Sequence, residues 1–338
     1  MKKKPAKKSA AGVHLGIDIA KDKFDAVLRT AAGAQHHEVF ANDAAGLKAL
    51  GRWLTQHRTG PLTCVMEATG IYWEEAAAWL HARRHTVHVL NPAAARRFAE
   101  SQLCRNKTDA VDAALLCRMA QIAVQCALTV WTPPAAAVLH LRALSRARCR
   151  LVAARAALRV QVQETRHRLI QQSLRTLLQA HDRQIRQLER ALQAHVKAHP
   201  ELAAEIALLT SIPGIAFISA TAIRSELATL HHAGVRQTVA YAGLNPRQWQ
   251  SGKSVQGRSR LSKTGHARLR HALSLPALTG WRHHPLLRAF AARLLAKSKK
   301  KMEIVGALMH ELLAHCCGVL KPRKPFDPHW LAPQQTSA

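Results

Sequence analysis

The sequence predicts an α/β domain at the N-terminus, a long helical middle segment and a mostly α-helical C-terminal domain. Apolar and polar residues alternate in residues 13–19 and 23–30, which is typical of half-buried β-strands. Apolar runs at 62–66 and 86–90 are separated by helical patterns, as in an α/β sheet. Residues 136–199 contain neither Gly nor Pro, which favours long uninterrupted helices. A chain of 338 residues is long enough for two domains with separate cores.

The first domain, residues 13–130, is expected to begin with three strands and to continue with alternating helices and strands. A short third strand fits around residues 37–41. The later elements are expected at 44–57 (helix), 62–66 (strand, ending at Glu67), 71–84 (helix), 86–90 (strand), 93–103 (helix) and 107–126 (helix). This order is the one expected of a ribonuclease-H-like, or RuvC-like, α/β fold.

Changes in composition divide the rest of the chain. Residues 1–12 form a basic tail that we expect to be disordered, and Trp131–Pro134 has the composition of a linker. Residues 136–200 should form a helical coiled-coil segment, residues 206–320 a C-terminal domain and residues 321–338 a Pro-rich tail. The coiled-coil seam would contain Leu174, Leu177, His181, Ile185, Leu188 and Leu192. Packing within one chain and pairing between two chains both agree with this spacing.

The charge of the chain indicates its class of partner. There are 50 Lys and Arg against 20 Asp and Glu, a formal net charge of +30. Folding does not need such a charge, whereas a polyanion such as nucleic acid does. A membrane surface is the rival partner, but no apolar run approaches the length of a membrane span and residues 1–9 do not resemble a signal peptide. We therefore expect a nucleic-acid partner, no membrane, and a cytoplasmic, bacterial-type and nucleoid-associated location.

Four carboxylates are unusual in this basic background. Asp18 lies on the first expected strand, Glu67 ends the fourth, and Asp109 and Asp112 share one face at the start of a helix. Like charges at i and i+3 repel unless a cation lies between them, and Mg²⁺ prefers oxygen ligands. Each acid alone has an ordinary explanation, as a turn residue, a surface acid or a partner of the helix dipole. Together they predict a site for two Mg²⁺ ions, whereas Asp25 is assigned to an exposed strand face.

The C-terminal domain contains a segment dense in Gly, Ser and cations. Its cations, and two cations beside the Asp pair, are expected to bind nucleic acid: Arg105, Lys107, Lys253, Arg258, Arg260, Lys263, His266, Arg268 and Arg270. Either this segment is a basic loop that contacts phosphates, or one of its serines attacks a phosphate. Composition does not choose the serine. Upstream, Pro213–Gly214 is either an ordinary helix turn or the turn of a helix-hairpin-helix, whose amides can bind a DNA phosphate.

Short motifs along nearly the whole chain resemble one known family, the insertion-sequence transposases and Piv-type DNA invertases with an N-terminal DEDD, RuvC-like domain. They occur in the order that the family shows. The motifs are Gly16–Lys21, Met66–Gly70, Asn91–Pro92, Arg105–Asp112, Ser211–Ile215, Tyr241–Leu244, and Ser251–Gly252 through Ser262–His266. One departure is Ala216–Phe217, where many relatives have a second glycine after Pro-Gly-Ile, and it weakens the expected phosphate contact of the hairpin.

The resemblance implies a catalytic centre made of two halves. Asp18, Glu67, Asp109 and Asp112 would be the DEDD ligands of Mg²⁺, and Ser251 would attack DNA to give a phosphoserine link and a free 3′ hydroxyl. The metal site of one subunit would work with the serine of another, which implies a dimer or tetramer. The family also implies donor and target DNA as substrates and a structured guide RNA, as in the bridge-RNA-guided recombinases.

Two other functions agree with the same residues. One is a RuvC-like Holliday-junction nuclease that uses only metal and water, with Ser251 contacting a phosphate. The other is a nucleic-acid-binding protein without catalytic activity, in which the four acids have a structural role. A transposase or DNA recombinase is the function that the motifs favour.

Overall fold

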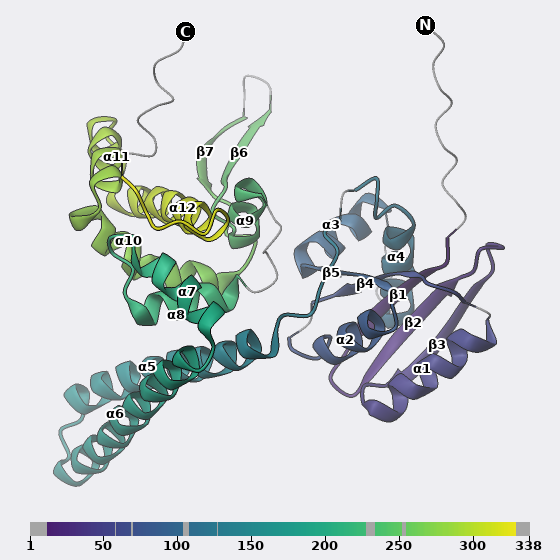
Figure 1. The fold of residues 1–338 in the computed structure, drawn as a ribbon, viewed down its shortest axis with the longest axis horizontal. Coiled ribbons are helices and arrows are strands. Elements are labelled where there is room, and N and C mark those ends of the chain that lie inside the picture. The colour runs from purple at the N-terminus through teal and green to yellow at the C-terminus, as the bar shows by residue number, and fades with distance from the viewer. Residues whose placement is uncertain are drawn as a thin grey trace, which may run out of the picture. The chain divides into compact units, whose positions relative to one another are not determined.

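The computed structural model describes residues 12–57, 59–68, 70–103, 108–126, 128–227, 234–251 and 255–328. The chain divides into two compact units, Met1–Pro133 and Pro134–Ala338, each with its own hydrophobic core (Figure 1). The first unit is α/β and the described part of the second is mostly helical, as the sequence predicted.

A five-stranded sheet forms the centre of the first unit. Its strands are β1 (His14–Ile19), β2 (Lys23–Arg29), β3 (Gln35–Ala41), β4 (Thr63–Glu67) and β5 (Thr86–Leu90), in the spatial order β3-β2-β1-β4-β5. The pairs β1–β2 and β2–β3 are antiparallel, while β4 runs parallel to both β1 and β5. The five expected strands are confirmed, with ends that differ by at most two residues.

Helices cover both faces of this sheet. They are α1 (Ala44–Gln56), α2 (Glu74–Ala82), α3 (Pro92–Ser101) and α4 (Asp109–Gln121). Leu15 and Ile17 of β1 share a core cluster with apolar residues of α1 and α2. On the opposite face, a Cβ added to Gly16 would overlap the backbone of Ala113 and Cys117, so α4 contacts β1 directly. Because side chains alternate along a strand, Asp18 lies on the α4 side with Gly16.

The expected helices of this unit are also present, and each is shorter than predicted. The helix predicted from residue 71 begins at Glu74, and the one predicted at 107–126 spans Asp109–Gln121. Thr108 is its N-cap, since the Thr108 side chain accepts a hydrogen bond from Val111 N at 3.3 Å. This cap fixes where α4 begins and places both aspartates in its first turn.

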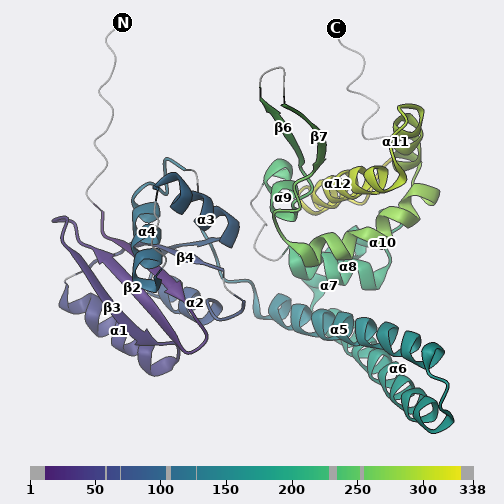
Figure 2. The ribbon, with the colours of Figure 1, turned by 180° about the vertical axis from the view of Figure 1, so that it is seen from behind.

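Two long helices, α5 (Ala136–Glu164) and α6 (Arg168–Lys197), open the second unit. Ion pairs show that they are antiparallel: Arg148 pairs with Glu189 at 2.7 Å, and Arg155 with Asp182 at 2.9 Å. Moving seven residues forward on α5 therefore means moving seven back on α6. Both helices lie side by side in Figures 1 and 2.

The remaining part of the second unit is a helical core with a β-hairpin. The helices are α7 (Pro200–Thr210), α8 (Phe217–Glu226), α9 (Val235–Ala242), α10 (Ala267–His283), α11 (Pro285–Ala296) and α12 (Lys301–Leu320). The hairpin strands β6 (Pro246–Ser251) and β7 (Val255–Leu261) were not predicted (Figure 2). The turn between α7 and α8 packs against α10, where a Cβ on Gly214 would lie 2.9 Å from Gly280 N.

Helix α12 is long and apolar enough, by length and composition, to cross a membrane, which the prediction of no membrane-length run overlooked. However, 56% of its most apolar window is buried inside the protein. Ile304, Leu308 and Leu312 are fully buried in the core of the second unit. A core helix has this pattern of burial.

Candidate functional site

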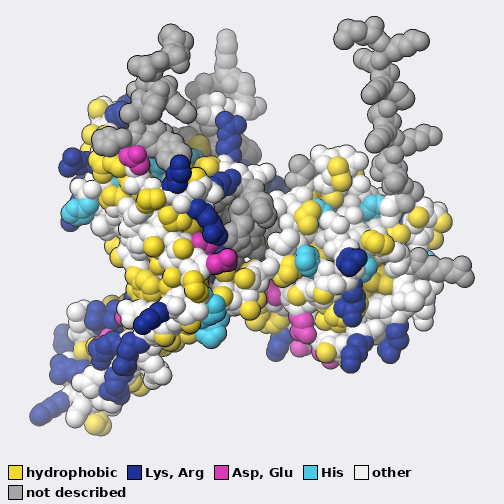
Figure 3. Space-filling model, viewed as in Figure 1, with side chains coloured by type: hydrophobic (Ala, Val, Ile, Leu, Met, Phe, Trp, Pro, Cys, Tyr) yellow, Lys and Arg dark blue, Asp and Glu magenta, His cyan; other side chains and the backbone are white. Residues whose placement is uncertain are grey.

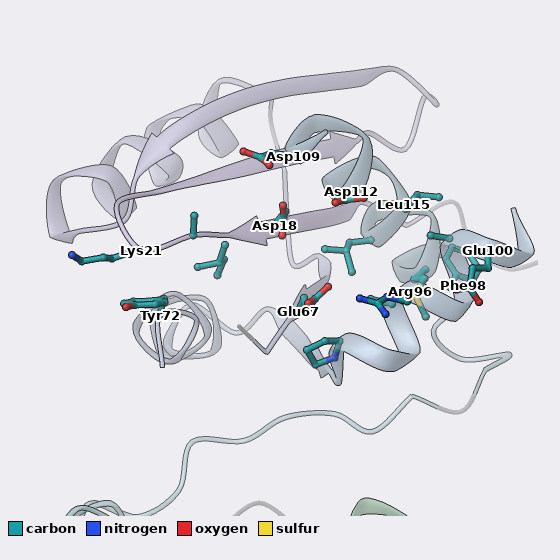
Figure 4. A pocket seen from close by; sticks show the side chains of 17 residues that line it. Asp18, Lys21, Glu67, Tyr72, Arg96, Phe98, Glu100, Asp109, Asp112 and Leu115 are labelled. Carbon is teal, nitrogen blue, oxygen red and sulfur yellow. The ribbon is translucent and has the colours of Figure 1, made fainter. Parts of the chain in front are cut away.

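The four predicted carboxylates line one pocket of the first unit, with a volume of about 660 Å³ (Figure 4). Asp18 and Glu67 are neighbours there because β1 and β4 are parallel, with Ile17 opposite Met66. Asp109 and Asp112 come from the first turn of α4, which packs on β1. The C-terminal ends of β1 and β4 and the first turn of α4 therefore bring together residues that are far apart in the sequence.

The electrostatics of the pocket show that these groups interact. The pKa of Asp18 is raised to about 6, first by burial and then by the negative charges of Asp112, Glu67 and Asp109. A smaller contribution comes from Asp25. Such a rise is expected where carboxylates share a site without enough positive charge between them. The pocket therefore favours a bound cation.

Asp25 is the residue that the sequence misplaced. It was assigned to an exposed face, but it is 4% exposed and lies opposite Asp18 across the β1–β2 pair. Its Oδ1 is 2.9 Å from His37 Nε2, and its Oδ2 is 3.4 Å from Lys23 Nζ. The assignment was wrong because the face of β2 that carries Asp25 is covered by protein.

Lys23 links this buried acid to the predicted metal site. Its Nζ donates to Asp109 Oδ2 at 2.9 Å, in a contact that is half-exposed on both sides. Lys23 was not singled out from the sequence. A usable signal was its position two residues before Asp25 on the same strand, which puts both side chains on one face.

The four carboxylates have the right donor atoms for a divalent metal, but their side chains are too far apart in this structure to bind one ion together. All four are oxygen donors, which suit Mg²⁺, Ca²⁺ or Mn²⁺. Within the ranges that the structure describes, no three His, Cys, Asp or Glu side chains are close enough together to hold one ion. Bringing Asp109 into such a group would require it to exchange the Lys23 ammonium for the metal.

The predicted serine and basic residues belong to the second unit, apart from two in the first. Ser251 is the last residue of β6, with its backbone opposite Val255, and Arg258 lies in β7. Arg105, Lys107 and Lys253 lie outside the described residues. Three more predicted cations have exposed side chains: Arg260, Lys263 and Arg268.

The other two predicted cations, His266 and Arg270, have internal partners. His266 caps α10, its Nδ1 accepting from Leu269 N at 3.2 Å, and its Nε2 lies 3.4 Å from Glu226 Oε2. Burial lowers the pKa of His266 to about 4, although Glu226 opposes the shift. Arg270 donates to Ala242 O at 2.8 Å. These contacts hold the start of α10 against α8 and α9.

Sequence reasoning missed a buried ion pair beside His266. Arg146 of α5 donates to Glu226 of α8 through Nε at 2.8 Å and through a terminal nitrogen at 2.7 Å. Burial alone would raise the pKa of Glu226, but Arg146 holds that pKa below its usual value. A two-point pair of this kind is directional, so it fixes α8 against α5.

Comparisons with known proteins agree with this architecture. A DEDD transposase family model (DEDD_Tnp_IS110, described as "Transposase") matches residues 15–171, which include all four carboxylates. A second model, "Transposase IS116/IS110/IS902 family", matches residues 206–292, which include Ser251.

The curated relatives match over almost their whole lengths. The pilin gene-inverting protein of Moraxella bovis is 31% identical over 331 residues, covering 93% of this chain and 97% of the relative. That of Moraxella lacunata is 31% identical over 326 residues, with the same coverage. A putative transposase of Sinorhizobium fredii is 42% identical over 79 residues, covering 23% of this chain and 20% of the relative. Near-complete relatives and two family models in the same order show that the chain belongs to the IS110 family of transposases and DNA invertases, enzymes that cleave and rejoin DNA.

Proposed function

We propose that the chain is a mobile-element recombinase that uses the acidic pocket and Ser251 together to cut and rejoin DNA. The observation that carries this proposal is the meeting of Asp18, Glu67, Asp109 and Asp112 in one pocket. The strand order β3-β2-β1-β4-β5 supports a ribonuclease-H-like fold for the first unit. The pilin gene-inverting relatives, which are named for inverting a gene, support DNA as the substrate.

The four carboxylates would hold the metal, with Mg²⁺ as the expected ion and two ions per site. Bound Mg²⁺ would supply Lewis-acid stabilisation of the charge that develops on the phosphate oxygens. Before binding, Lys23 neutralises Asp109, and Asp18 is partly protonated near pH 6. The Asp18 proton and the contact between Lys23 and Asp109 would therefore be replaced by a bound cation.

The serine step conserves the number of phosphate ester bonds. Ser251 Oγ would form a bond to the phosphorus while the bond from phosphorus to the 3′ oxygen breaks. The hydroxyl proton passes to a base or to water, and the 3′ oxygen takes up a proton to become a free hydroxyl. Rejoining is the reverse reaction with a different 3′ hydroxyl, so no external energy source is required.

Trapping of a protein–DNA adduct tests this step. The purified full chain, with the RNA that accompanies it, would be mixed with labelled duplex DNA from the ends of the element, with Mg²⁺ or with EDTA. We expect a labelled adduct on a denaturing gel for the wild type with Mg²⁺ and for the control Ser262→Ala, but none for Ser251→Ala. An adduct that persisted in Ser251→Ala would refute the serine assignment. Unchanged cleavage by Asp109→Asn with Asp112→Asn would refute the metal assignment.

The same assay separates the alternative functions. A junction nuclease using water and metal would cut DNA without any adduct in the wild type. A protein that only binds would neither cut nor form an adduct. If cleavage required Ser251 but left a free 5′ phosphate, Ser251 would contact the phosphate without being the nucleophile.

Subunit cooperation and the guide RNA have their own tests. If the metal site of one subunit acts with the serine of another, mixing Asp109→Asn with Ser251→Ala chains should restore part of the cleavage that each lacks alone. Light scattering would give the dimer or tetramer mass from the 37.2 kDa chain. Sequencing the RNA that copurifies, followed by ribonuclease treatment before the assay, would show whether a structured guide RNA is required.

A further inference from the structure

Helix α6 carries an exposed stripe of positive charge that the cleavage chemistry does not use. Its members share one face of the helix and are Arg168, Arg175, Arg183, Arg186, Arg190 and Lys197. At 100° per residue they fall within an arc of about 80°, and at 1.5 Å per residue they extend over about 43 Å. All six side chains are exposed. We name this set the α6 stripe.

The stripe lies on a different side of α6 from its packing face. The residues buried on this helix are Ile185, Leu192 and Val196, which lie about 120° away from the centre of the stripe. The acids of α6 are turned toward α5, where Asp182 and Glu189 pair with arginines. Among the side chains that the structure describes, no ion pair within 4 Å joins a member of the stripe to a carboxylate. Figure 3 shows Lys and Arg gathered over the α5–α6 hairpin.

This arrangement is unfavourable for the helix by itself. Arg183 and Arg186 are three residues apart, and Arg186 and Arg190 are four apart, so like charges are neighbours on the surface. Each such pair destabilises an isolated helix by about 0.2–0.5 kcal/mol. An ordinary solvent-exposed helix face carries both positive and negative side chains, so that this repulsion is offset. A polyanionic partner would remove it too.

Duplex DNA is the partner that fits this surface. The stripe is long and carries one sign of charge, and it contains no aromatic side chain on which an unpaired base could stack. A second copy of the chain offers little negative surface, with 20 acids against 50 Lys and Arg. An anionic membrane fits less well, because Ile185, Leu192 and Val196 are buried and the exposed apolar side chains of α6, Leu169, Ile170 and Leu177, are confined to its first turns.

We propose that the α6 stripe binds the phosphate backbone of duplex DNA without reading its sequence. It would add affinity for DNA, whichever residues perform the cleavage, so the proposal goes beyond the chemistry at Ser251 and the acids. Contacts from point charges to phosphates position a duplex but carry no sequence information. Each contact releases condensed counterions, which makes the binding depend on salt concentration.

The test compares two triple variants of the full chain. Arg175→Gln, Arg183→Gln and Arg190→Gln remove three charges from the stripe. The matched control, Lys48→Gln, Arg52→Gln and Arg84→Gln, removes three exposed charges from the first unit. Binding to a 30-base-pair duplex of random sequence would be measured in EDTA across a range of salt concentrations, so that cleavage plays no part.

For the stripe variant we expect the slope of log K against log salt to fall by about 2 to 3, because each phosphate contact contributes about 0.9. Affinity near 0.1 M salt should fall by at least about 10-fold. An Arg-to-Lys version at the same three positions should retain the wild-type slope. Circular dichroism would verify that the helices remain folded.

Three results would overturn the proposal. The first is an equal loss of DNA affinity in the control variant, which would mean that binding depends on the total charge of the protein and not on the α6 stripe. The second is a Lys version that binds as weakly as the Gln version. The third is a loss limited to duplex RNA or to single strands, tested with matched oligonucleotides, which would assign the stripe to a different nucleic acid. The cleavage assay can fail without affecting any of these measurements.

Discussion

Gly16→Ala would test whether the acidic pocket depends on close contact between α4 and β1. A Cβ at position 16 would lie 2.8 Å from Cys117 Cα and would overlap Cys117 N and Ala113 O. Carbon atoms are normally about 3.5–4.0 Å apart at contact, so α4 would have to move by roughly 1 Å. Because all three of these atoms belong to the backbone, no side-chain rotation can relieve the overlap. The displaced helix carries Asp109 and Asp112 with it.

The expected loss can be estimated from this displacement. Overpacking of a core costs about 1–3 kcal/mol of unfolding free energy. A 1 Å misplacement of catalytic groups can lower a rate by about 100-fold. We therefore expect Gly16→Ala to reduce Mg²⁺-dependent DNA cleavage by about 100-fold while lowering stability by about 1–3 kcal/mol.

The assays are urea unfolding, hydrogen exchange of the α4 amides and the rate of DNA cleavage. Gly60→Ala is the matched control, since a Cβ there meets nothing within 4 Å, and it should behave as the wild type in all three. Wild-type cleavage together with unchanged α4 exchange in Gly16→Ala would refute the reasoning. It would mean that the acids do not depend on the contact between helix and strand.

Three further predictions concern other groups. His284 is fully buried, and burial together with the neighbouring His315 lowers its pKa to about 4. Because the unfolded chain takes up this proton more readily, the free energy of unfolding should fall by up to about 3 kcal/mol as the pH drops from 6.5 to 4. His284→Asn, which keeps the acceptor that caps α11, should flatten that dependence in urea titrations. Arg146→Met should lower the free energy of unfolding by about 3–5 kcal/mol, because the buried Glu226 carboxylate loses its two-point partner, and Glu226→Gln added to it should recover part of the loss. Lys23→Gln should tighten metal binding by calorimetry, since the ammonium no longer competes with the cation for carboxylate oxygens; weaker binding would show that Lys23 organises the site.

The strands and the four acids were predictable because both follow from local patterns. Alternation placed Asp18 on the side of β1 opposite Ile17, and the run of apolar residues before Glu67 placed that acid at a strand end. The same alternation placed Asp25 correctly on the other side of β2 from its apolar neighbours. It failed to predict burial, because alternation gives the side of a strand and not what covers it.

Features that depend on tertiary contacts could not be read from the sequence. The β6–β7 hairpin is formed by a polar, basic segment without an apolar face, so the pattern gave no strand signal. His266 and Arg270 looked like phosphate contacts by composition, and only the fold gives them internal partners. The roles of Ser251 and of the metal remain predictions from family resemblance.

The position of α4 at the end of the first unit has a consequence during protein synthesis. A ribosome makes β1 with Asp18 about 90 residues before it makes Asp109 and Asp112. A chain interrupted anywhere before α4 therefore carries only Asp18 and Glu67 of the four acids and lacks the helix that packs on Gly16. The acidic pocket can therefore assemble only after α4 has been synthesised.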